Sequence, residues 1–277
     1  MRLATLSVPG RTAAALDFGT HYRLTPFRDV AALLREVDGD LTRVADLEVD
    51  DTVPCEEAVL APTVLTPSKI ICLGLNYADH ILEMGHGGEQ YPTLFAKFPA
   101  TLTGPFDNIE IPSSSNAVDW EVELGVVIGK RARNVMATKG RDHIAGFVVA
   151  NDVSMRDFQR RTSQFLQGKI FERTTPIGPE MVTPDEVDYA LDLKISCSVD
   201  GIEMQSSRTS HMITTVAESI SYISQIVTLE PGDLILTGTP SGVGAGRTPP
   251  VFLSNDQVVT SYIEGIGELV NRFVSEK

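Results

Sequence analysis

The chain has 277 residues, of which 42% are hydrophobic and 22% charged, and these proportions are typical of a globular protein with one large domain, alone or with a smaller one. Its net charge of −14 argues against nucleic acid or an anionic membrane as a partner, because an acidic surface repels both. No apolar stretch approaches the roughly 20 residues of a membrane span and the N-terminus shows no secretion signal, so we expect a cytoplasmic protein.

Residues 1–65 differ from the rest of the chain. They carry two acidic patches and, around 30–35, a stretch that favours a short helix. Two prolines then interrupt 60–68, as in a linker or an irregular edge. We place a domain boundary there, which predicts a small N-terminal domain of residues 1–65 and a main domain of residues 66–277.

The three cysteines are scattered along the chain, at Cys55, Cys72 and Cys197. Their number is odd and no C-x-x-C pair occurs, which argues against a disulfide framework and against a zinc site. We therefore expect them to be small apolar core residues of a protein in a reducing compartment.

The main domain begins with a short apolar strand at 69–75. Helical periodicity is clearest from Ile213 to Val227, where apolar residues recur at three- and four-residue steps. Asp200-Gly201 predicts a hairpin turn, and the prolines at 176–179 predict a rigid turn. Because helices are few and do not alternate with strands, we expect a β-rich α+β fold and not a doubly wound or barrel α/β fold. Further strands are expected at 121–128, 144–151, 190–199, 202–207, 233–237 and 257–263.

Two glutamates lie one residue apart in the segment 121–128. Side chains two apart on a strand point to the same face, so Glu121 and Glu123 converge while their apolar neighbours face the other way. A half-exposed edge strand with two solvated glutamates would explain most such pairs, but the residues that follow are too apolar for a solvated strand. Two buried like charges need a positive partner, and we interpret the pair as ligands of a hard divalent cation.

A third carboxylate, Asp152, lies where the apolar run 144–151 ends. Functional side chains are often held at such strand ends. Taken alone, the Asn151-Asp152 pair is better explained as a turn. Together with Glu121 and Glu123, however, Asp152 completes three oxygen ligands and leaves room for water or substrate, as Mg²⁺ prefers.

His80 and Glu83 are three residues apart in a stretch that can start a helix, where they would share a face. A carboxylate beside an imidazole is a common general base near neutral pH. On spacing alone, an exposed histidine with an ordinary i,i+3 partner explains the pair better. The glycine-rich segment 85–91 that follows suits a mobile loop, and we assign no role to His86 within it.

Polar residues in three further stretches are candidate site residues only because of their sequence context. Lys169 lies beside apolar residues and can place a positive charge on an anion, although most lysines are solvated. Arg156 and Gln159 follow Asp152 by four and seven residues, so that one helical face would carry all three. The strand at 233–237 leads into a Gly/Thr/Pro turn that either exposes backbone N–H groups to a ligand or is only a turn.

Four motifs occur in the order and spacing of the fumarylacetoacetate hydrolase family, which the chain resembles from about Lys69 to Asn271. Each motif is weak alone, and the four are jointly specific. The resemblance implies a roll-like mixed β-sandwich preceded by a small N-terminal domain, usually in a homodimer. The motifs begin at Gly74-Leu75-Asn76-Tyr77, Glu121-Val122-Glu123-Leu124, Asn151-Asp152-Val153-Ser154 and Leu236-Thr237-Gly238-Thr239-Pro240.

The same resemblance implies roles for particular residues. It implies Mg²⁺ or Mn²⁺ held by three carboxylates, those of Glu121, Glu123 and Asp152. His80 and Glu83 match the water-activating pair of the acylpyruvate hydrolases. Lys169 matches the active-site lysine of the family. Substrate contacts are implied for Tyr77, Arg156, Gln159 and Thr239. One departure is Glu172, where the family often has aspartate; with residues 173–175, it could change the substrate contacts.

Our first functional hypothesis is metal-dependent hydrolysis of the carbon–carbon bond of an acylpyruvate, fumarylpyruvate-like substrate to pyruvate and a carboxylic acid, in aromatic-compound catabolism. His80 would activate water, and the charge of the pyruvate enolate would fall on the metal and Lys169. Two alternatives use a similar enolate without activated water: decarboxylation of oxaloacetate, and isomerisation of a 2-hydroxyhepta-2,4-diene-1,7-dioate-type diacid. The alternative from another class is a non-catalytic metal-binding scaffold protein.

Overall fold

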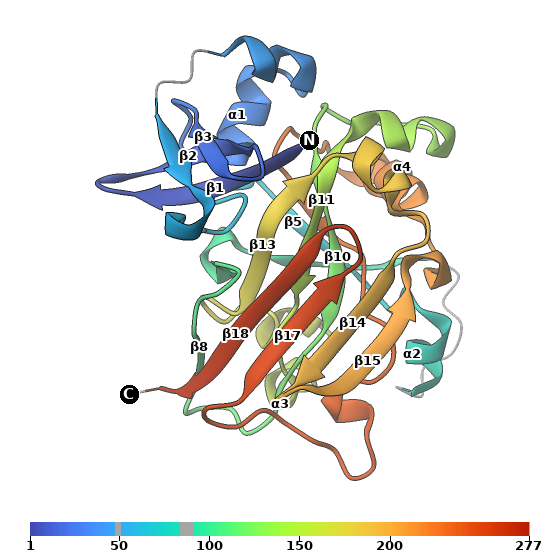
Figure 1. The fold of residues 1–277 in the computed structure, drawn as a ribbon. Coiled ribbons are helices and arrows are strands. Elements are labelled where there is room, and N and C mark those ends of the chain that lie inside the picture. The colour runs from blue at the N-terminus through green and yellow to red at the C-terminus, as the bar shows by residue number, and fades with distance from the viewer. Residues whose placement is uncertain (48–50, 84–90, 277) are drawn as a thin grey trace.

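The computed structural model describes residues 1–47, 51–83 and 91–276. In these residues strands far outnumber helices, and most strands belong to two stacked sheets (Figure 1), which confirms the β-rich α+β fold. The described helices are α1 (Val30–Glu36), α2 (Ala78–Glu83), α3 (Arg156–Gln159) and α4 (Val216–Ile226). None of these four is long and apolar enough to span a membrane.

The larger sheet has the strand order β4-β3-β2-β1-β13-β11-β10-β16-β5-β6, with β7 beside β13, and the smaller sheet has the order β15-β14-β17-β18-β8. The strands of the larger sheet are β1 (Arg2–Val8), β2 (Arg11–Asp17), β3 (His21–Leu24), β4 (Thr52–Pro54), β5 (Ile70–Gly74), β6 (Thr93–Lys97), β7 (Leu102–Thr103), β10 (Val122–Ile128), β11 (Ile144–Asn151), β13 (Thr175–Val182) and β16 (Leu234–Leu236). Those of the smaller sheet are β8 (Ile109–Ile111), β14 (Lys194–Val199), β15 (Ile202–Arg208), β17 (Val258–Ile263) and β18 (Gly267–Ser275). Two short strands, β9 (Val118–Asp119) and β12 (Ser154–Met155), pair with each other.

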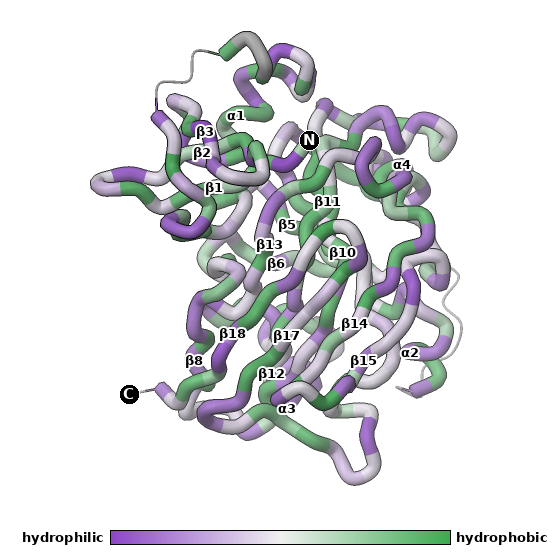
Figure 2. The backbone as a smooth tube through the Cα atoms, in the orientation of Figure 1, coloured by the Kyte–Doolittle hydropathy of each residue, from purple (hydrophilic) through white to green (hydrophobic). Residues whose placement is uncertain are grey.

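Strands β10 and β11 lie inside the larger sheet and are buried on both faces. One face of β10, with Val122 and Leu124, joins Phe147 of β11 in a core shared with the smaller sheet. The other face, with Val127, joins a second core that includes the buried side of α1. Figure 2 shows hydrophobic residues along the central strands β5, β10 and β11. Burial on both faces explains why these segments are near-continuous apolar runs in the sequence.

The N-terminal region extends the larger sheet. Strand β1 pairs antiparallel with β13, so that Arg2 lies opposite Val182 and Leu3 opposite Met181. Strands β2, β3 and β4 follow outward from β1, and α1 packs on the same sheet. Residues 1–65 therefore share a hydrogen-bonded sheet with the main body, and the domain boundary near residue 65 stays a prediction.

Several elements differ from their expected form. The segment 176–179 is not a turn but part of strand β13, where the β11–β13 register shifts between Phe147 and Val149 and so accommodates the prolines. Helix α4 begins only at Val216, because Thr215 caps it, and Ile213 precedes it with 53% of its surface exposed. Strand β14 begins at Lys194 and not at residue 190.

Of the three cysteines, Cys72 and Cys197 are buried in the core, as predicted, and neither is in a disulfide. Cys55 is only half-buried, beside Asp17 in the N-terminal strands, so the prediction of a core position is wrong for this residue. The N-terminal strands form a small apolar cluster of their own that is too thin to enclose it.

The two-sheet core allows a direct stability test. Phe147 is fully buried, whereas Phe106 is 55% exposed. We expect Phe147→Ala to lower the free energy of unfolding by about 3–5 kcal/mol, because it leaves a cavity between the sheets. Phe106→Ala, the control, should change it by less than about 1 kcal/mol. Urea denaturation measures both; similar losses in the two variants would contradict this assignment of the core.

Candidate active site and metal centre

The pairing of β10 with β11 brings the three predicted carboxylates together. Val122 lies opposite Asn151, so Glu121 and Glu123 at the start of β10 lie beside Asp152 at the end of β11. One carboxylate oxygen from each lies within 4.8 Å of the others, and all three side chains are buried. The Asp152 N–H donates to the Glu121 carbonyl at 2.9 Å, which fixes the strand ends against each other.

Two buried lysines lie against this cluster. Lys169 Nζ is 2.6 Å from Glu121 Oε2 and 2.7 Å from Asp152 Oδ2. Lys97 Nζ, at the end of β6, is 2.5 Å from Asp152 Oδ1. Sequence reasoning anticipated Lys169 and missed Lys97, because nothing in the local pattern distinguishes a buried lysine from a solvated one.

Glu123 is the carboxylate that the lysines leave least compensated. Within the described residues its only hydrogen bond comes from the Gly238 N–H at 2.7 Å, and no basic side chain lies within 4.0 Å of it. Burial, with the charges of Asp152 and Glu121, raises the pKa of Glu123 well above its usual range. A buried carboxylate in this position favours a cation beside it.

The donor set fits Mg²⁺ or Mn²⁺. All three ligands offer hard oxygen atoms, and each carboxylate has about four lone-pair positions, enough to accept from a lysine and to coordinate a metal. A divalent cation would leave the three carboxylates and two lysines with one net positive charge. The site would then attract an anionic substrate despite the acidic surface of the protein.

Arg156, at the start of α3, connects the metal ligands to a fourth carboxylate. Its Nη1 is 2.6 Å from Glu121 Oε1, and its Nε donates to Asp119 Oδ2 at 2.8 Å. Burial alone would raise the pKa of Glu121, but Lys169 and Arg156 outweigh it and lower that pKa to about 2. Glu121 is therefore ionised at neutral pH. Arg156 Nη2 is buried and has no partner among the described residues, which leaves it available to an anion.

Gln159 ends the same short helix, and its Oε1 accepts from Arg156 at 3.0 Å. Asp152 lies four residues before α3 and outside it, so the prediction that one helical face carries all three is wrong. Asp152 reaches the site from the end of a strand, and Arg156 and Gln159 reach it from the helix that follows.

The predicted histidine–glutamate pair is formed on α2. His80 Nδ1 is 3.1 Å from Glu83 Oε2, and His80 is buried. The other carboxylate oxygen of Glu83 accepts from the Gly242 N–H at 2.9 Å. Gly246 also approaches Glu83 so closely that a Cβ there would lie 2.5 Å from its carboxyl carbon. The pair is thus held by backbone and is not the loose exposed pair that its spacing alone suggested.

Asp119 joins this loop to the metal ligands, a role that sequence reasoning missed. Besides binding Arg156, it accepts from the N–H groups of Gly244 and Ala245 at 2.7 and 2.9 Å. The loop that positions Glu83 is therefore fixed to the arginine that positions Glu121. The turn after β16 does expose backbone N–H groups, as one interpretation of the sequence had it, but these bind carboxylates of the protein itself.

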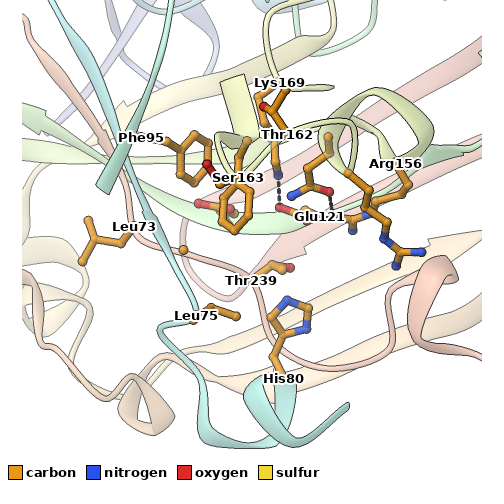
Figure 3. Close-up of a pocket in the computed structure, with 15 residues that line it drawn as sticks. Leu73, Leu75, His80, Phe95, Glu121, Arg156, Thr162, Ser163, Lys169 and Thr239 are labelled. Atoms are coloured by element: carbon orange, nitrogen blue, oxygen red, sulfur yellow. Dashed lines mark hydrogen bonds and ion pairs between the residues drawn. The ribbon is translucent and has the colours of Figure 1, made fainter. Parts of the chain in front are cut away.

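A cavity of about 470 Å³ opens onto these groups (Figure 3). Figure 3 shows His80 pointing from α2 toward Thr239 and Glu121, with Lys169 on the opposite side. The lining is partly apolar and partly polar. A volume of this order suits a small organic ligand. The apolar lining residues include Leu73, Leu75, Phe95 and Phe165, and the polar ones include Gln159, Arg160, Thr162 and Ser163.

The remaining predicted residues have different positions. Thr239 lines the cavity, where its hydroxyl donates to the Val122 carbonyl at 2.9 Å. Tyr77 is fully buried and is not among the lining residues; its hydroxyl has no hydrogen-bond partner in the described part of the chain. None of residues 172–175, among them Glu172, is among the lining residues of the cavity. His86 and most of the 85–91 loop lie outside the described residues.

Comparison with known proteins agrees with this architecture. Residues 69–274 match the fumarylacetoacetate (FAA) hydrolase C-terminal domain. The chain is 48% identical over 224 residues to the mitochondrial oxaloacetate tautomerase FAHD2A of Bos taurus. The aligned residues cover 80% of this chain and 71% of that protein. Two solved structures align over their full length and that of this chain. The fumarylacetoacetate hydrolase of Exiguobacterium antarcticum has a TM-score of 0.87 at 32% identity, and the 5-carboxymethyl-2-hydroxymuconate delta-isomerase of Mycobacterium smegmatis has 0.81 at 30%.

The chain therefore belongs to the fumarylacetoacetate hydrolase family, as its motifs predicted. Members of this family are enzymes, and they include hydrolases, isomerases and an oxaloacetate tautomerase.

The position of Glu123 predicts opposite effects of one substitution with and without metal. Glu123→Gln removes a buried like charge, so the metal-free variant should be at least as stable as the wild type. It should lose the stabilisation by Mg²⁺ or Mn²⁺, which for the wild type is about 2.7 kcal/mol at a concentration of 100 Kd. Thermal unfolding with EDTA and with each metal measures both effects. Glu172→Gln, at an exposed site, is the control; a metal response retained by Glu123→Gln would remove Glu123 from the ligand set.

Proposed function

We propose that this protein is a divalent-metal-dependent enzyme that forms and protonates the enolate of a short 2-oxo-diacid, as in keto–enol tautomerisation of oxaloacetate. The observation that carries the proposal is that Glu121 and Glu123 of the buried carboxylate cluster line one cavity together with His80, which Glu83 contacts. The oxaloacetate tautomerase activity named for the Bos taurus relative supports it. The cations around the site favour an anionic substrate.

The chain's own groups account for the proton transfer. A cation held by Glu121, Glu123 and Asp152 would act as a Lewis acid on the 2-oxo group and neutralise developing charge. Glu83 accepts the Nδ1–H of His80, which leaves Nε2 as the base. His80 removes a proton from C3 of the diacid and returns it to the oxygen on C2. The C–H electron pair becomes the C2–C3 double bond, and no atom is gained or lost. Lys169, which lines the cavity, would stabilise the negative oxygen.

Acylpyruvate hydrolysis, our first hypothesis from the sequence, is the second candidate. The 3.1 Å contact between His80 and Glu83 favours it, because the same pair can take a proton from water. The cavity of about 470 Å³ also has room for an acyl chain. In this reaction the hydroxide attacks the distal carbonyl, and the C–C bond breaks to give pyruvate enolate and a carboxylic acid.

Replacement of the base tests the shared part of both candidates. His80→Ala should lower kcat about 10²–10⁴-fold, because a positioned base contributes a factor of this size. Metal affinity should stay close to that of the wild type, because His80 is not among the three ligands. Steady-state kinetics and metal titration on the same sample check both. Turnover that survives the substitution would rule out His80 as the base.

Isotope experiments separate the two candidates. With oxaloacetate in D₂O, the proposed tautomerase should introduce deuterium at C3 faster than the uncatalysed exchange, with no pyruvate released. With an acylpyruvate in H₂¹⁸O, a hydrolase should place ¹⁸O in the released carboxylic acid. NMR and mass spectrometry read out the products, with His80→Ala as the matched control. A protein inactive in both assays with Mg²⁺ and Mn²⁺ would revive the scaffold alternative.

A further inference from the structure

Three cationic side chains line the cavity within the described part of the chain, and two of them already bind carboxylates of the protein, with only Nη2 of Arg156 left without a partner there. Lys169 binds Glu121 and Asp152, and Arg156 binds Asp119 and Glu121. The third, Arg160, makes no ion pair and no side-chain hydrogen bond with any residue in 1–47, 51–83 or 91–276. A guanidinium that borders a cavity without a carboxylate partner can receive an anion from the solvent side.

The position of Arg160 is fixed although its side chain is exposed. It caps the C-terminal end of α3, where its N–H donates to the Arg156 carbonyl at 3.1 Å. Arg160 is therefore one helical turn from Arg156, which in turn contacts Glu121 of the carboxylate cluster. Close to it in the sequence, Thr162 and Ser163 add two hydroxyl groups to the lining of the cavity.

We propose that Arg160 binds the distal carboxylate of the substrate and so selects 2-oxo-diacids over 2-oxo-monoacids. The proposal rests on the proposed function, in which the 2-oxo end of the substrate lies at the carboxylate cluster. Phe95 and Phe165, which also line the cavity, then contact the carbon chain, and Arg160 receives the far end. Guanidinium suits this task because it binds a carboxylate through two parallel hydrogen bonds.

The neighbouring residue provides a matched control. Arg161 is also exposed, but it does not line the cavity, and its guanidinium carbon lies 3.4 Å from the centre of the Phe158 ring. Arg160→Gln and Arg161→Gln therefore make the same change in charge and size one residue apart. A general effect of surface charge would appear in both variants, and a specific contact only in the first.

Two ligands that differ only at the far end test the proposal. 2-Oxoglutarate and 2-oxopentanoate have the same five-carbon chain, and only the first carries a distal carboxylate. Calorimetric titration in saturating Mg²⁺ measures the affinity of the wild type and the two variants for each. We expect the wild type to bind the diacid about 10–100-fold more tightly, as for a charge-assisted hydrogen-bonded contact. Arg160→Gln should abolish this preference and leave 2-oxopentanoate affinity unchanged, Arg160→Lys should restore part of it, and Arg161→Gln should retain it.

A diacid preference that persists in Arg160→Gln, or is lost equally in Arg161→Gln, would overturn the assignment of Arg160. Equal affinity of the wild type for the two ligands would overturn it as well. Oxalate, which can occupy only the metal end, distinguishes these results from a failure of the proposed function. If oxalate binds in a Mg²⁺-dependent way, the site at the carboxylates stands whatever Arg160 does. If neither oxalate nor either 2-oxo acid binds, the proposed function and the inference that rests on it both fail.

Discussion

Three carboxylates in the interior of the larger sheet set the main constraint on this structure. At an effective dielectric constant of about 20, two like charges 4 Å apart repel by about 4 kcal/mol, and each buried ion also loses its hydration. The fold answers this with cations from different parts of the chain: Lys97 from β6, Lys169 from the segment after η5 (Phe165–Gly168), and Arg156 from α3. These three segments must therefore pass close to the carboxylates at the ends of β10 and β11, because their cations compensate the charge there.

The same constraint links the two chemical halves of the site. Asp119 holds Arg156 on one side and the N–H groups of the 244–245 loop on the other, and the same loop contacts Glu83 through Gly242 and Gly246. The distance between the His80–Glu83 pair and the carboxylate cluster is thus set by a loop fixed at several points. Such fixed geometry is what proton transfer to a defined carbon requires.

The parts of the fold that the sequence predicted are those with a strong local signal. The runs at 122–128 and 144–151 are apolar because both of their faces are buried, and the carboxylates in or directly beside them were conspicuous for that reason. Lys97 and Asp119 gave no such signal, because their importance comes from partners far away in the chain. The prolines of β13 led to the prediction of a turn, because proline is rare inside a central strand. Here they are accommodated beside a register shift. The choice among reactions depends on a few atoms in the cavity, which family membership does not fix.

Lys169 and Lys97 have a further consequence for how the protein acquires its cofactor. Because the lysines already compensate Glu121 and Asp152, the charge cluster is tolerable before any metal arrives, and folding does not have to wait for an ion. Lys169 would, however, compete with a metal ion, because it contacts oxygens of Glu121 and Asp152 that would also coordinate the metal. A divalent cation would then load onto a preformed scaffold, unlike in a zinc finger that folds only around its ion. The fraction of active molecules would follow the free divalent-cation concentration of the surrounding compartment.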